Sequence, residues 1–421
     1  MLDIAILEGA RTPFAKANGV FASLPAQELG RIAAVEAMRR ADLRPDQIDQ
    51  VVVGNVVQPA DAANIARVVA LKAGVPADRI AHTVQRNCAS GMEAITTAAQ
   101  LIRLGEAKMV LAGGVESMSR IPLLYSTEAT ALYLRLSKAK TAWQRLKTLL
   151  SFRPRHFKPV VGVQLGLTDP MCGKLMGSLA DFSAREFGVT RADQDAFGLE
   201  SHRRAADAQK RGVLAAEIAP VGDAKEDNGV RKEQTLDALA RLKPFFEKDG
   251  TVTVGNSSQV TDGAAAVIVA PGAAVRAEGR RPLGYLRAFA YAGVEPERMA
   301  LGPIYATSKL LAKTGLRLEA FDLIEMNEAF AAVVLVNEKA FASDSFAREM
   351  LGRESALGMI DPNKLNVNGG AIALGHPVGA TGTRLVLTLL KELRRRGLRR
   401  GLATLCVGGG QGGAAFVETA E

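Results

Sequence analysis

Short apolar runs alternate with segments of helical periodicity in the first part of the chain. The apolar runs, which are rich in β-branched residues, predict strands at residues 4–7, 51–57, 81–85 and 107–112. Apolar residues at intervals of three and four predict helices at residues 28–41, 64–73 and 90–104. Strands that alternate with helices in this way are typical of an α/β layer.

The same order of elements returns in the second half. Its predicted strands cover residues 321–326 and 401–407, and its predicted helices cover residues 307–314, 328–339 and 380–396. The apolar run and glycine pair of Lys108–Gly114 have a counterpart in Leu402–Gly409. We interpret this as an internal duplication. Two like domains packed together would bring the ends of related elements to a common site.

An insertion at about residues 119–254 separates the two halves. Its first part, residues 126–157, combines leucines and Trp143 with arginines and lysines, and it predicts a basic amphipathic helix or helix pair. Such a segment is either a solvated helix packed on its own domain or an interfacial helix that binds a partner or a membrane. Residues 193–210 predict a polar helix, and residues 241–246 predict a turn before a strand that starts at Thr251.

Composition narrows the class of protein. The 421 residues are 48% hydrophobic and 23% charged, as in ordinary globular proteins, and no apolar stretch is long enough to span a bilayer as a helix. The apolar pattern of the first residues predicts a strand, and it does not resemble a signal or transit peptide. The three cysteines, Cys88, Cys172 and Cys406, are odd in number and lack the paired spacing of a zinc site. We therefore expect a cytoplasmic protein with reduced thiols and without a metal.

The charge balance favours anionic partners. There are 53 Lys and Arg against 44 Asp and Glu, which gives a net charge of +9, and much of the excess lies in residues 135–158 and 391–400. Nucleic acid is a poor candidate because the chain has no recognition-helix signature, zinc finger or aromatic stacking platform. Anionic small molecules, an acidic partner or a membrane surface fit the charge better.

Three reactive side chains stand at the ends of predicted elements. Cys88 lies between a strand and a helix, where helix amides and a nearby imidazole would lower the pKa of a thiol. His376 has a glycine-rich setting, and Cys406 ends a strand before Gly408, where free backbone N–H groups could bind an oxyanion. Each signal is weak alone, since a cysteine before a helix is usually a small core residue and a glycine-rich turn is often only a turn.

Together, and in chain order, these segments resemble the thiolase family. The resemblance covers nearly the whole chain and rests on Asn87-Cys88-Ala89-Ser90-Gly91-Met92, Gly255-Asn256-Ser257-Ser258 with Asp262–Ala265, Asn327-Glu328-Ala329-Phe330-Ala331, Gly375–Gly382 and Cys406–Gly412. It implies an α/β thiolase fold, with two similar βαβαβ-type halves in a layered α/β/α/β/α arrangement and an inserted loop domain. We expect the first half at residues 1–118 and 255–274, the loop domain at residues 119–254, and the second half at residues 275–421.

The resemblance also implies how the site works. Cys88 would attack the acyl carbonyl and become an acyl-enzyme, His376 would activate that thiol and help to bind the thioester oxygen, and Cys406 would exchange a proton with the α-carbon. Asn327 would hold a water that forms one oxyanion hole with His376. The backbone amides of Cys88 and Gly408 would form the other. Acylation followed by transfer predicts ping-pong kinetics.

Three further residues are expected at the substrate. The resemblance places Ser258 at the pantetheine arm of coenzyme A and Met176 near the substrate. Phe330 would line the acyl pocket, although an ordinary core aromatic is an equally good interpretation. Coenzyme A would be a substrate, and no permanently bound cofactor is expected.

Two segments, one in the insertion and one after the predicted helix at residues 328–339, indicate the fatty-acid-degrading branch of the family. Residues 165–170 and 346–352 resemble thiolase subunits of trifunctional β-oxidation complexes. This implies a 3-ketoacyl-CoA thiolase that forms a homodimer or higher oligomer and pairs with a hydratase/dehydrogenase subunit, with the insertion contacting either that partner or a membrane peripherally. Two positions depart from family patterns. Leu175 stands where many short-chain biosynthetic thiolases carry a histidine, and Gln259 replaces the glycine usual after Ser258.

Other functions remain open at this point. The same residues could catalyse the reverse condensation, as in an acetoacetyl-CoA-forming thiolase. A non-catalytic lipid carrier or scaffold could retain the fold, but the intact Cys88, His376 and Cys406 argue against it. Ketoacyl synthases would need a second histidine in place of Cys406, and the local motifs do not fit a papain-like protease.

Overall fold

The computed structural model of the chain describes residues 2–420. Its strands are β1 (Ile4–Arg11), β2 (Ala15–Lys16), β3 (Gln50–Gly54), β4 (Ile80–Val84), β5 (Val110–Ser117), β6 (Leu123–Leu124), β7 (Val160–Val161), β8 (Thr261–Pro271), β9 (Gly284–Gly293), β10 (Leu323–Met326), β11 (Arg400–Val407) and β12 (Gln411–Thr419). Its α-helices are α1 (Ala26–Arg40), α2 (Ile65–Lys72), α3 (Ser90–Arg103), α4 (Thr127–Lys138), α5 (Ala142–Leu149), α6 (Gly162–Gly166), α7 (Met176–Glu186), α8 (Arg191–Lys210), α9 (Leu236–Ala240), α10 (Gly272–Ala277), α11 (Gly302–Thr314), α12 (Ala331–Phe341), α13 (Asp344–Leu351), α14 (Ala371–Leu374) and α15 (Val378–Arg396).

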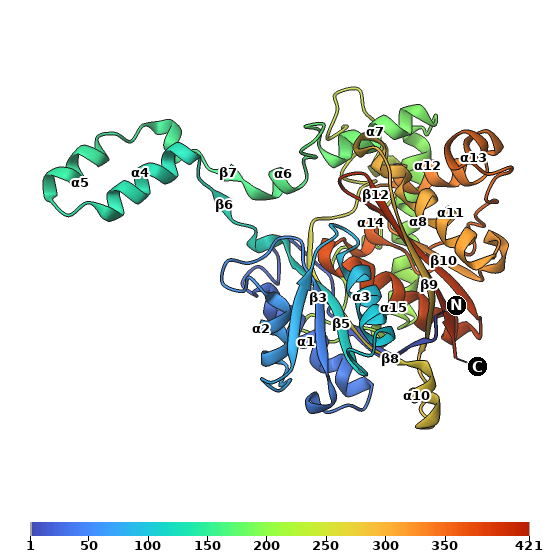
Figure 1. Ribbon diagram of the computed structural model, residues 1–421. Coiled ribbons are helices and arrows are strands. Elements are labelled where there is room, and N and C mark those ends of the chain that lie inside the picture. Colours follow the sequence, from blue (N-terminus) through green and yellow to red (C-terminus); the bar gives the residue numbers. More distant parts are fainter. Residues whose placement is uncertain (1, 421) are drawn as a thin grey trace.

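The long strands form a mixed sheet in the order β10-β11-β12-β9-β1-β8-β5-β3-β4 (Figure 1). The two halves meet where Ile4–Ile6 of β1 pair antiparallel with Gly284–Leu286 of β9. On one side of this junction β3, β4 and β5 run parallel to one another, and on the other side β10 and β11 do. The carboxyl ends of these parallel strands carry the candidate residues.

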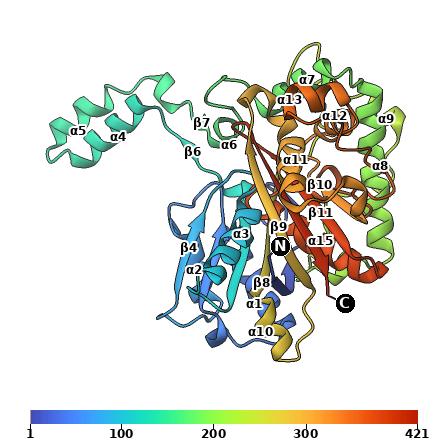
Figure 2. The ribbon, with the colours of Figure 1, turned by 45° about the vertical axis from the view of Figure 1, so that its right-hand side comes forward.

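Helices cover both faces of each half and give the layered arrangement that the sequence predicts (Figure 2). Because side chains alternate between the faces of a strand, Ala5 and Leu7 join a core with α1 and α2, whereas Ile4 and Ile6 join a core with α3 and α15. In the second half α11 and α12 cover the outer face. Helices α3 and α15 pack against each other between the two sheet halves. The predicted α/β/α/β/α layering is confirmed.

The strand order repeats between the halves, as the duplication predicts. Strand β5 lies between parallel β3 and antiparallel β8, and β11 lies between parallel β10 and antiparallel β12. Strand β4 leads to Cys88 and α3. In the second half Leu365 pairs in parallel with Ile324 of β10, and the chain then leads to His376 and α15. Cys88 and His376 therefore occupy related positions, at the starts of the two central helices.

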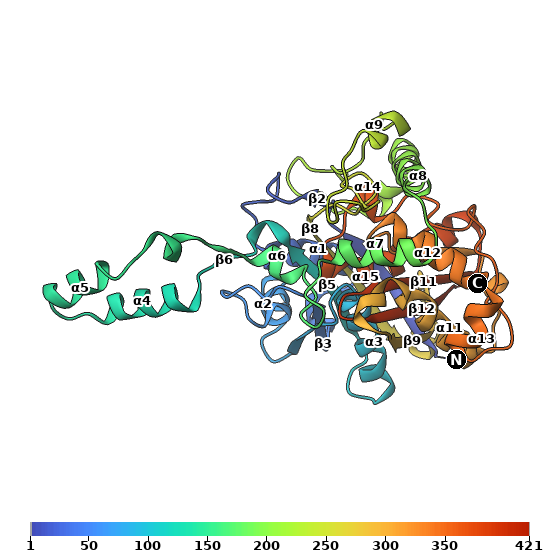
Figure 3. The ribbon, with the colours of Figure 1, turned by 90° about the horizontal axis from the view of Figure 1, so that it is seen from above.

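Residues 126–157 form the helix pair that the sequence predicts. Helices α4 and α5 pack against each other and stand away from the body on the short β6–β7 ladder (Figures 1 and 3). The alternative of a helix packed on its own domain does not hold for this chain. Trp143 is 72% exposed and Leu150 is 76% exposed. We call residues 123–161 the arm.

One predicted strand is wrong. Thr251 and Val252 lie in an irregular segment, because the carboxylate of Asp181 accepts their backbone N–H groups at 2.6 and 3.0 Å in place of a neighbouring strand. The strand that completes the first half is β8, which begins at Thr261. Within residues 2–420, no helix has the length and apolar character needed to cross a membrane.

Candidate active site

The turn before α3 presents the Cys88 side chain. Asn87 has a φ of 43°, in the left-handed region that asparagine tolerates better than most residues. Ser90 stabilises the turn, because its Oγ accepts the Arg86 N–H at 2.9 Å and donates to the Asn87 carbonyl at 2.7 Å. Cys88 is only partly buried as a whole residue. The predicted strand-to-helix position of Cys88 is confirmed.

The electrostatic setting of Cys88 differs from the expectation of a lowered pKa. Burial raises the pKa of the Cys88 thiol, and the nearby Glu116 carboxylate adds to this rise. The backbone N–H groups of Gly408 and of Cys88 itself lower the pKa and offset only part of the rise. The thiol is therefore protonated at rest, and it needs a base when it attacks.

His376 lies between β8 and α15 in a position fixed by hydrogen bonds. The Thr261 hydroxyl accepts its backbone N–H at 2.6 Å, and its ring Nδ1 lies 2.6 Å from the Thr381 hydroxyl. Thr381 also donates to the carbonyl of Pro377 at 3.1 Å, so Nδ1 carries the ring proton and Nε2 is the acceptor nitrogen of the ring. Burial, followed by the charge of Arg384, lowers the pKa of His376 to about 3. The ring is a neutral imidazole that can accept a proton.

Asn327 lies beside His376 at the end of β10. Its backbone N–H donates to the Thr404 carbonyl at 3.0 Å, and its Nδ2 is 3.5 Å from His376 Nε2. Its Oδ1 is buried and has no hydrogen-bond partner among the described residues. A buried amide oxygen without a partner is suited to receive a water or a ligand group. The structure thus brings together Asn327 and His376, the two residues that the resemblance names for one oxyanion hole.

Cys406 and Gly408 end β11 on the other side of the thiol. Cys406 is 2% exposed, and its pKa is raised by burial and by the neighbouring Cys88. The carbonyl of Gly408 accepts a hydrogen bond of 2.8 Å from Asn87 Nδ2, which anchors this turn to the Cys88 turn. Met176 is adjacent, since a Cβ on Gly408 would lie 3.3 Å from its sulfur. The fold thus brings Cys88, Cys406, Gly408 and Met176 together, as expected.

Ser258 and Phe330 lie side by side at the start of α12. The backbone N–H of Ser258 donates to the Ala329 carbonyl at 3.0 Å. The Phe330 ring meets the Phe246 ring edge to face, at 5.8 Å between centroids. Phe330 also contacts the apolar cluster that contains Cys406 and Met176. Its side chain is only partly buried there.

Several residues of the site had no predicted role. Thr381 orients the His376 ring, Asn87 anchors Gly408, and Phe246 packs over Gly177 beside Met176. Asn87 and Thr381 stand inside quoted motifs, so their proximity in sequence to Cys88 and His376 was the available signal. Phe246 stands in the segment predicted as a plain turn, and nothing local marks it.

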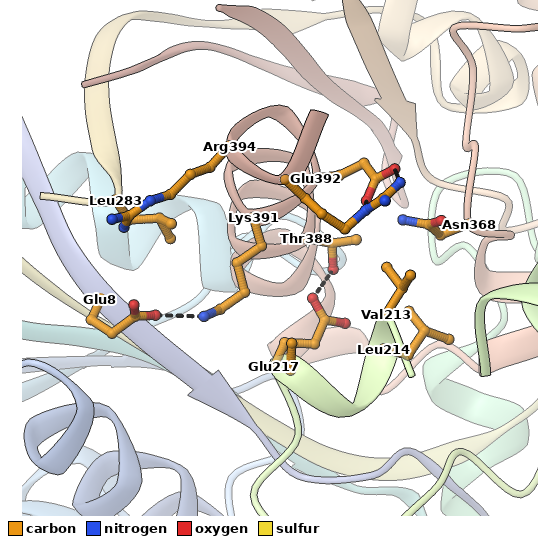
Figure 4. Close-up of a pocket in the computed structure, with 12 residues that line it drawn as sticks. Glu8, Val213, Leu214, Glu217, Leu283, Asn368, Thr388, Lys391, Glu392 and Arg394 are labelled. Atoms are coloured by element: carbon orange, nitrogen blue, oxygen red, sulfur yellow. Dashed lines mark hydrogen bonds and ion pairs between the residues drawn. The ribbon is translucent and has the colours of Figure 1, made fainter. Parts of the chain in front are cut away.

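A hollow of about 260 Å³ lies near the C-terminal end of α15, away from the start of that helix where His376 stands (Figure 4). Beside it Lys391 pairs with Glu8 at 2.6 Å and Thr388 donates to Glu217 at 2.8 Å, and Arg394 also lines it. Among residues 2–420, no group of three or more His, Cys, Asp or Glu side chains is placed to hold a metal ion.

Comparisons with known proteins agree with this geometry. Residues 4–273 match the thiolase N-terminal domain, and residues 280–419 match the thiolase C-terminal domain. The chain is 43% identical to a 3-ketoacyl-CoA thiolase of Yersinia enterocolitica over 423 residues, which cover 99% of this chain and 96% of the relative.

Solved structures give the same result. The acetyl-CoA acetyltransferase of Bacillus anthracis has a TM-score of 0.87 and 35% identity, over 100% of this chain and 99% of its own. The human mitochondrial 3-ketoacyl-CoA thiolase in complex with CoA has a TM-score of 0.85 and 34% identity, over 99% of this chain and 98% of its own. The protein therefore has the thiolase fold, and the chain belongs to the thiolase family.

Proposed function

We propose that the protein is a 3-ketoacyl-CoA thiolase of fatty-acid β-oxidation. It cleaves a 3-ketoacyl-CoA with coenzyme A into acetyl-CoA and a shortened acyl-CoA. The observation that carries the proposal is that Cys88 lies against Cys406 and the backbone N–H of Gly408, while the starts of α3 and α15, which follow Cys88 and the neutral His376, pack against each other. The similarity to a 3-ketoacyl-CoA thiolase over nearly the whole chain supports the same reaction.

The first step uses Cys88 as nucleophile. His376 Nε2 takes the thiol proton while the sulfur attacks the 3-keto carbon, and the bond between C2 and C3 then breaks. The N–H groups of Cys88 and Gly408 stabilise the oxyanion formed on the attacked carbonyl. The acyl group stays on Cys88, and Cys406 gives its proton to C2 of the departing acetyl-CoA.

The thioester oxygen of the departing group needs its own stabilisation. Asn327 Nδ2 and His376 lie next to each other, and a water held by Asn327 completes a second oxyanion hole there. Coenzyme A then attacks the acyl-Cys88 thioester and gives up its thiol proton to Cys406. The carbon–sulfur bond to Cys88 breaks, and the Cys88 thiolate takes back the proton held by His376. Ser258 and Met176 would contact the pantetheine arm, and Phe330 would line the acyl chain.

The test is a thiolysis assay with the purified protein, coenzyme A and 3-ketoacyl-CoA substrates of two lengths. We expect cleavage of both acetoacetyl-CoA and a long-chain 3-ketoacyl-CoA, with ping-pong kinetics. Cleavage of acetoacetyl-CoA alone would favour the acetoacetyl-CoA-forming alternative. Absence of any cleavage by a folded protein, with no acylation of Cys88, would favour the non-catalytic carrier or scaffold.

The arm is proposed to bring the enzyme to a membrane surface. It carries exposed apolar side chains, among them Trp143 and Leu150, next to arginines and lysines. This combination fits the boundary of an anionic bilayer. Leu124 pairs with Val160, so a short glycine–serine linker between them can replace residues 125–159. We expect this variant to cleave substrate normally and to lose cosedimentation with anionic vesicles, and unchanged cosedimentation would refute the role.

Self-association is proposed to use β4. This strand ends the sheet order and pairs only with β3 among the described strands, so its other edge is free, and Ile80 is exposed there. A free edge can pair with a second copy. We expect a dimer in light scattering and a monomer for Thr83→Pro; a dimer in both would exclude this edge.

A hydratase/dehydrogenase subunit is the further expected partner, and co-purification tests it.

A cytoplasmic location is part of the proposal. Cys88, Cys172 and Cys406 are all free, and the reaction requires reduced thiols, which the cytoplasm maintains. Cell fractionation tests this. Recovery of the protein from an oxidising compartment would contradict it.

A further inference from the structure

Glu116 is a buried carboxylate on β5 that the reaction described above does not use. It is fully buried, and its two oxygens accept four hydrogen bonds. Three come from the segment after β3: Asn55 Nδ2 at 2.9 Å, the Val56 N–H at 3.0 Å and the Val57 N–H at 3.2 Å. The fourth comes from the N–H of Gly379 at 3.1 Å. Gly379 stands three residues after His376, so Glu116 connects the two halves of the site.

The packing around Glu116 leaves little freedom. A Cβ on Gly379 would lie 2.5 Å from the Val115 carbonyl and 2.9 Å from the Glu116 carboxylate. A Cβ on Gly91, in the first turn of α3 after Cys88, would lie 2.7 Å from the Thr383 N–H of α15. The starts of α3 and α15 therefore approach each other, backbone to backbone, at β5. At this junction the Glu116 carboxylate accepts the N–H of Gly379, which belongs to α15.

The charge of Glu116 also acts on the nucleophile. Burial raises the pKa of Glu116 to about 7, against the opposing effect of its N–H partners. Above that pH it is a carboxylate, and it raises the pKa of Cys88. The other titratable group that interacts with Cys88 is Cys406 at the end of β11, while Arg384 of α15 acts on His376.

We propose that Glu116 is a positioning residue of the thiolase site, with two linked effects. Its hydrogen bond to Gly379 holds the start of α15, and with it His376, at the distance from Cys88 that proton transfer requires. Its negative charge keeps Cys88 in the thiol form until His376 removes the proton during attack. The inference rests on the proposed function, because it assigns a purpose to Glu116 only if Cys88 and His376 react together.

Glu116→Gln should slow thiolysis and, at the same time, make the Cys88 thiol easier to deprotonate. The substitution keeps the size of the side chain but removes the charge and places an amide donor opposite backbone donors. We expect kcat for thiolysis at pH 8 to fall by about 10- to 100-fold, the size of loss that small misplacements of reacting groups produce. We expect the pH midpoint for alkylation of Cys88 by iodoacetamide to fall, because a neighbouring negative charge is gone.

The alkylation is followed by mass spectrometry of the Cys88 peptide, so that Cys172 and Cys406 do not contribute. A general loosening of the fold would let water reach Cys88 and would also lower the midpoint, so Glu116→Asp, which keeps the charge, separates this cause from the loss of the negative charge. If the wild type is active, a lower kcat together with a lower alkylation midpoint in Glu116→Gln supports the proposal. Any other pair of results overturns it. If the wild type shows no thiolysis, the proposed function fails first, and the two failures are distinguishable.

Two variants complete the test. Glu116→Asp keeps the charge but shortens the reach, so we expect lower kcat with an unchanged midpoint. If Glu116→Gln does not fold, Glu116→Asp decides the question. A kcat equal to that of the wild type in Glu116→Asp would then overturn the proposal. The matched control is Asp322→Asn. Asp322 also accepts two backbone N–H groups, from Arg399 and Arg400, but at the opposite end of the sheet, and kcat should stay within about twofold of wild type.

Discussion

Replacing Thr381 with valine removes the hydroxyl that orients the catalytic imidazole. In the protein this hydroxyl lies 2.6 Å from His376 Nδ1 and donates to the Pro377 carbonyl. Valine has nearly the same shape, so the helix should fold, but the buried Nδ1–H loses its acceptor. The ring then either keeps an unsatisfied N–H or moves its proton to Nε2, where it can no longer take the proton of Cys88.

The size of the effect follows from the hydrogen bond. A buried polar group left without its partner costs about 1–3 kcal/mol. If that cost appears in the transition state for acylation, the rate falls by roughly 5- to 150-fold, at about 1.4 kcal/mol for each factor of ten. Quenched-flow mixing with an acyl-CoA, followed by mass spectrometry of the Cys88 peptide, measures the acylation rate directly.

Two variants serve as controls for Thr381→Val. Thr381→Ser restores the hydroxyl and should recover most of the acylation rate. Thr388→Val removes another buried hydroxyl of α15, which donates to Glu217 at 2.8 Å two turns further along, and it should leave acylation unchanged. Wild-type acylation in Thr381→Val, or an equal loss in Thr388→Val, would refute the role of the Thr381–His376 hydrogen bond.

Three further predictions concern the same site. Cys406→Ser should slow turnover far more than acylation of Cys88, as single-turnover and steady-state rates will show, and equal losses would contradict its role at C2. Gly177→Ala should raise KM for coenzyme A and lower stability by about 1–3 kcal/mol, because its methyl group would overlap the Phe246 ring. Because the pKa of His376 falls from 6.5 to about 3, the unfolded chain binds the proton more tightly, so stability should fall as pH drops from 6.5 to 3. His376→Asn should reduce that fall in chemical denaturation, and an unchanged pH dependence would contradict the lowered pKa.

The elements with strong periodicity could be predicted from the sequence. The helix at residues 90–104 and the strand at residues 401–407 agree with α3 and β11 within a residue, since their apolar patterns match one period only. Strands β9 and β12 were not predicted. They are rich in alanine, glycine and aromatic residues, and they become strands by pairing with each other across the second half of the sheet. Such long-range pairing leaves little local signal.

The reactive residues were recognisable, but their electrostatics were not. Cys88, His376 and Cys406 stand in motifs that local sequence reveals. The pKa of Cys88 is raised by burial and, to a smaller extent, by Glu116 on β5, and the pKa of His376 is lowered by burial and by Arg384. Similarly, Phe246 reaches Phe330 only through the fold. Contacts between distant segments decide these properties, and a single sequence does not contain them in readable form.

The central claim is that Cys88 carries the acyl group. Incubation with an acyl-CoA in the absence of free coenzyme A, followed by intact-mass measurement and peptide mapping, tests it most directly. The account predicts one acyl group on the Cys88 peptide of the wild type, none on Cys88→Ala, and loss of the acyl group when coenzyme A is added. An acyl group on Cys172 or Cys406, or thiolysis by Cys88→Ala at the wild-type rate, would contradict it.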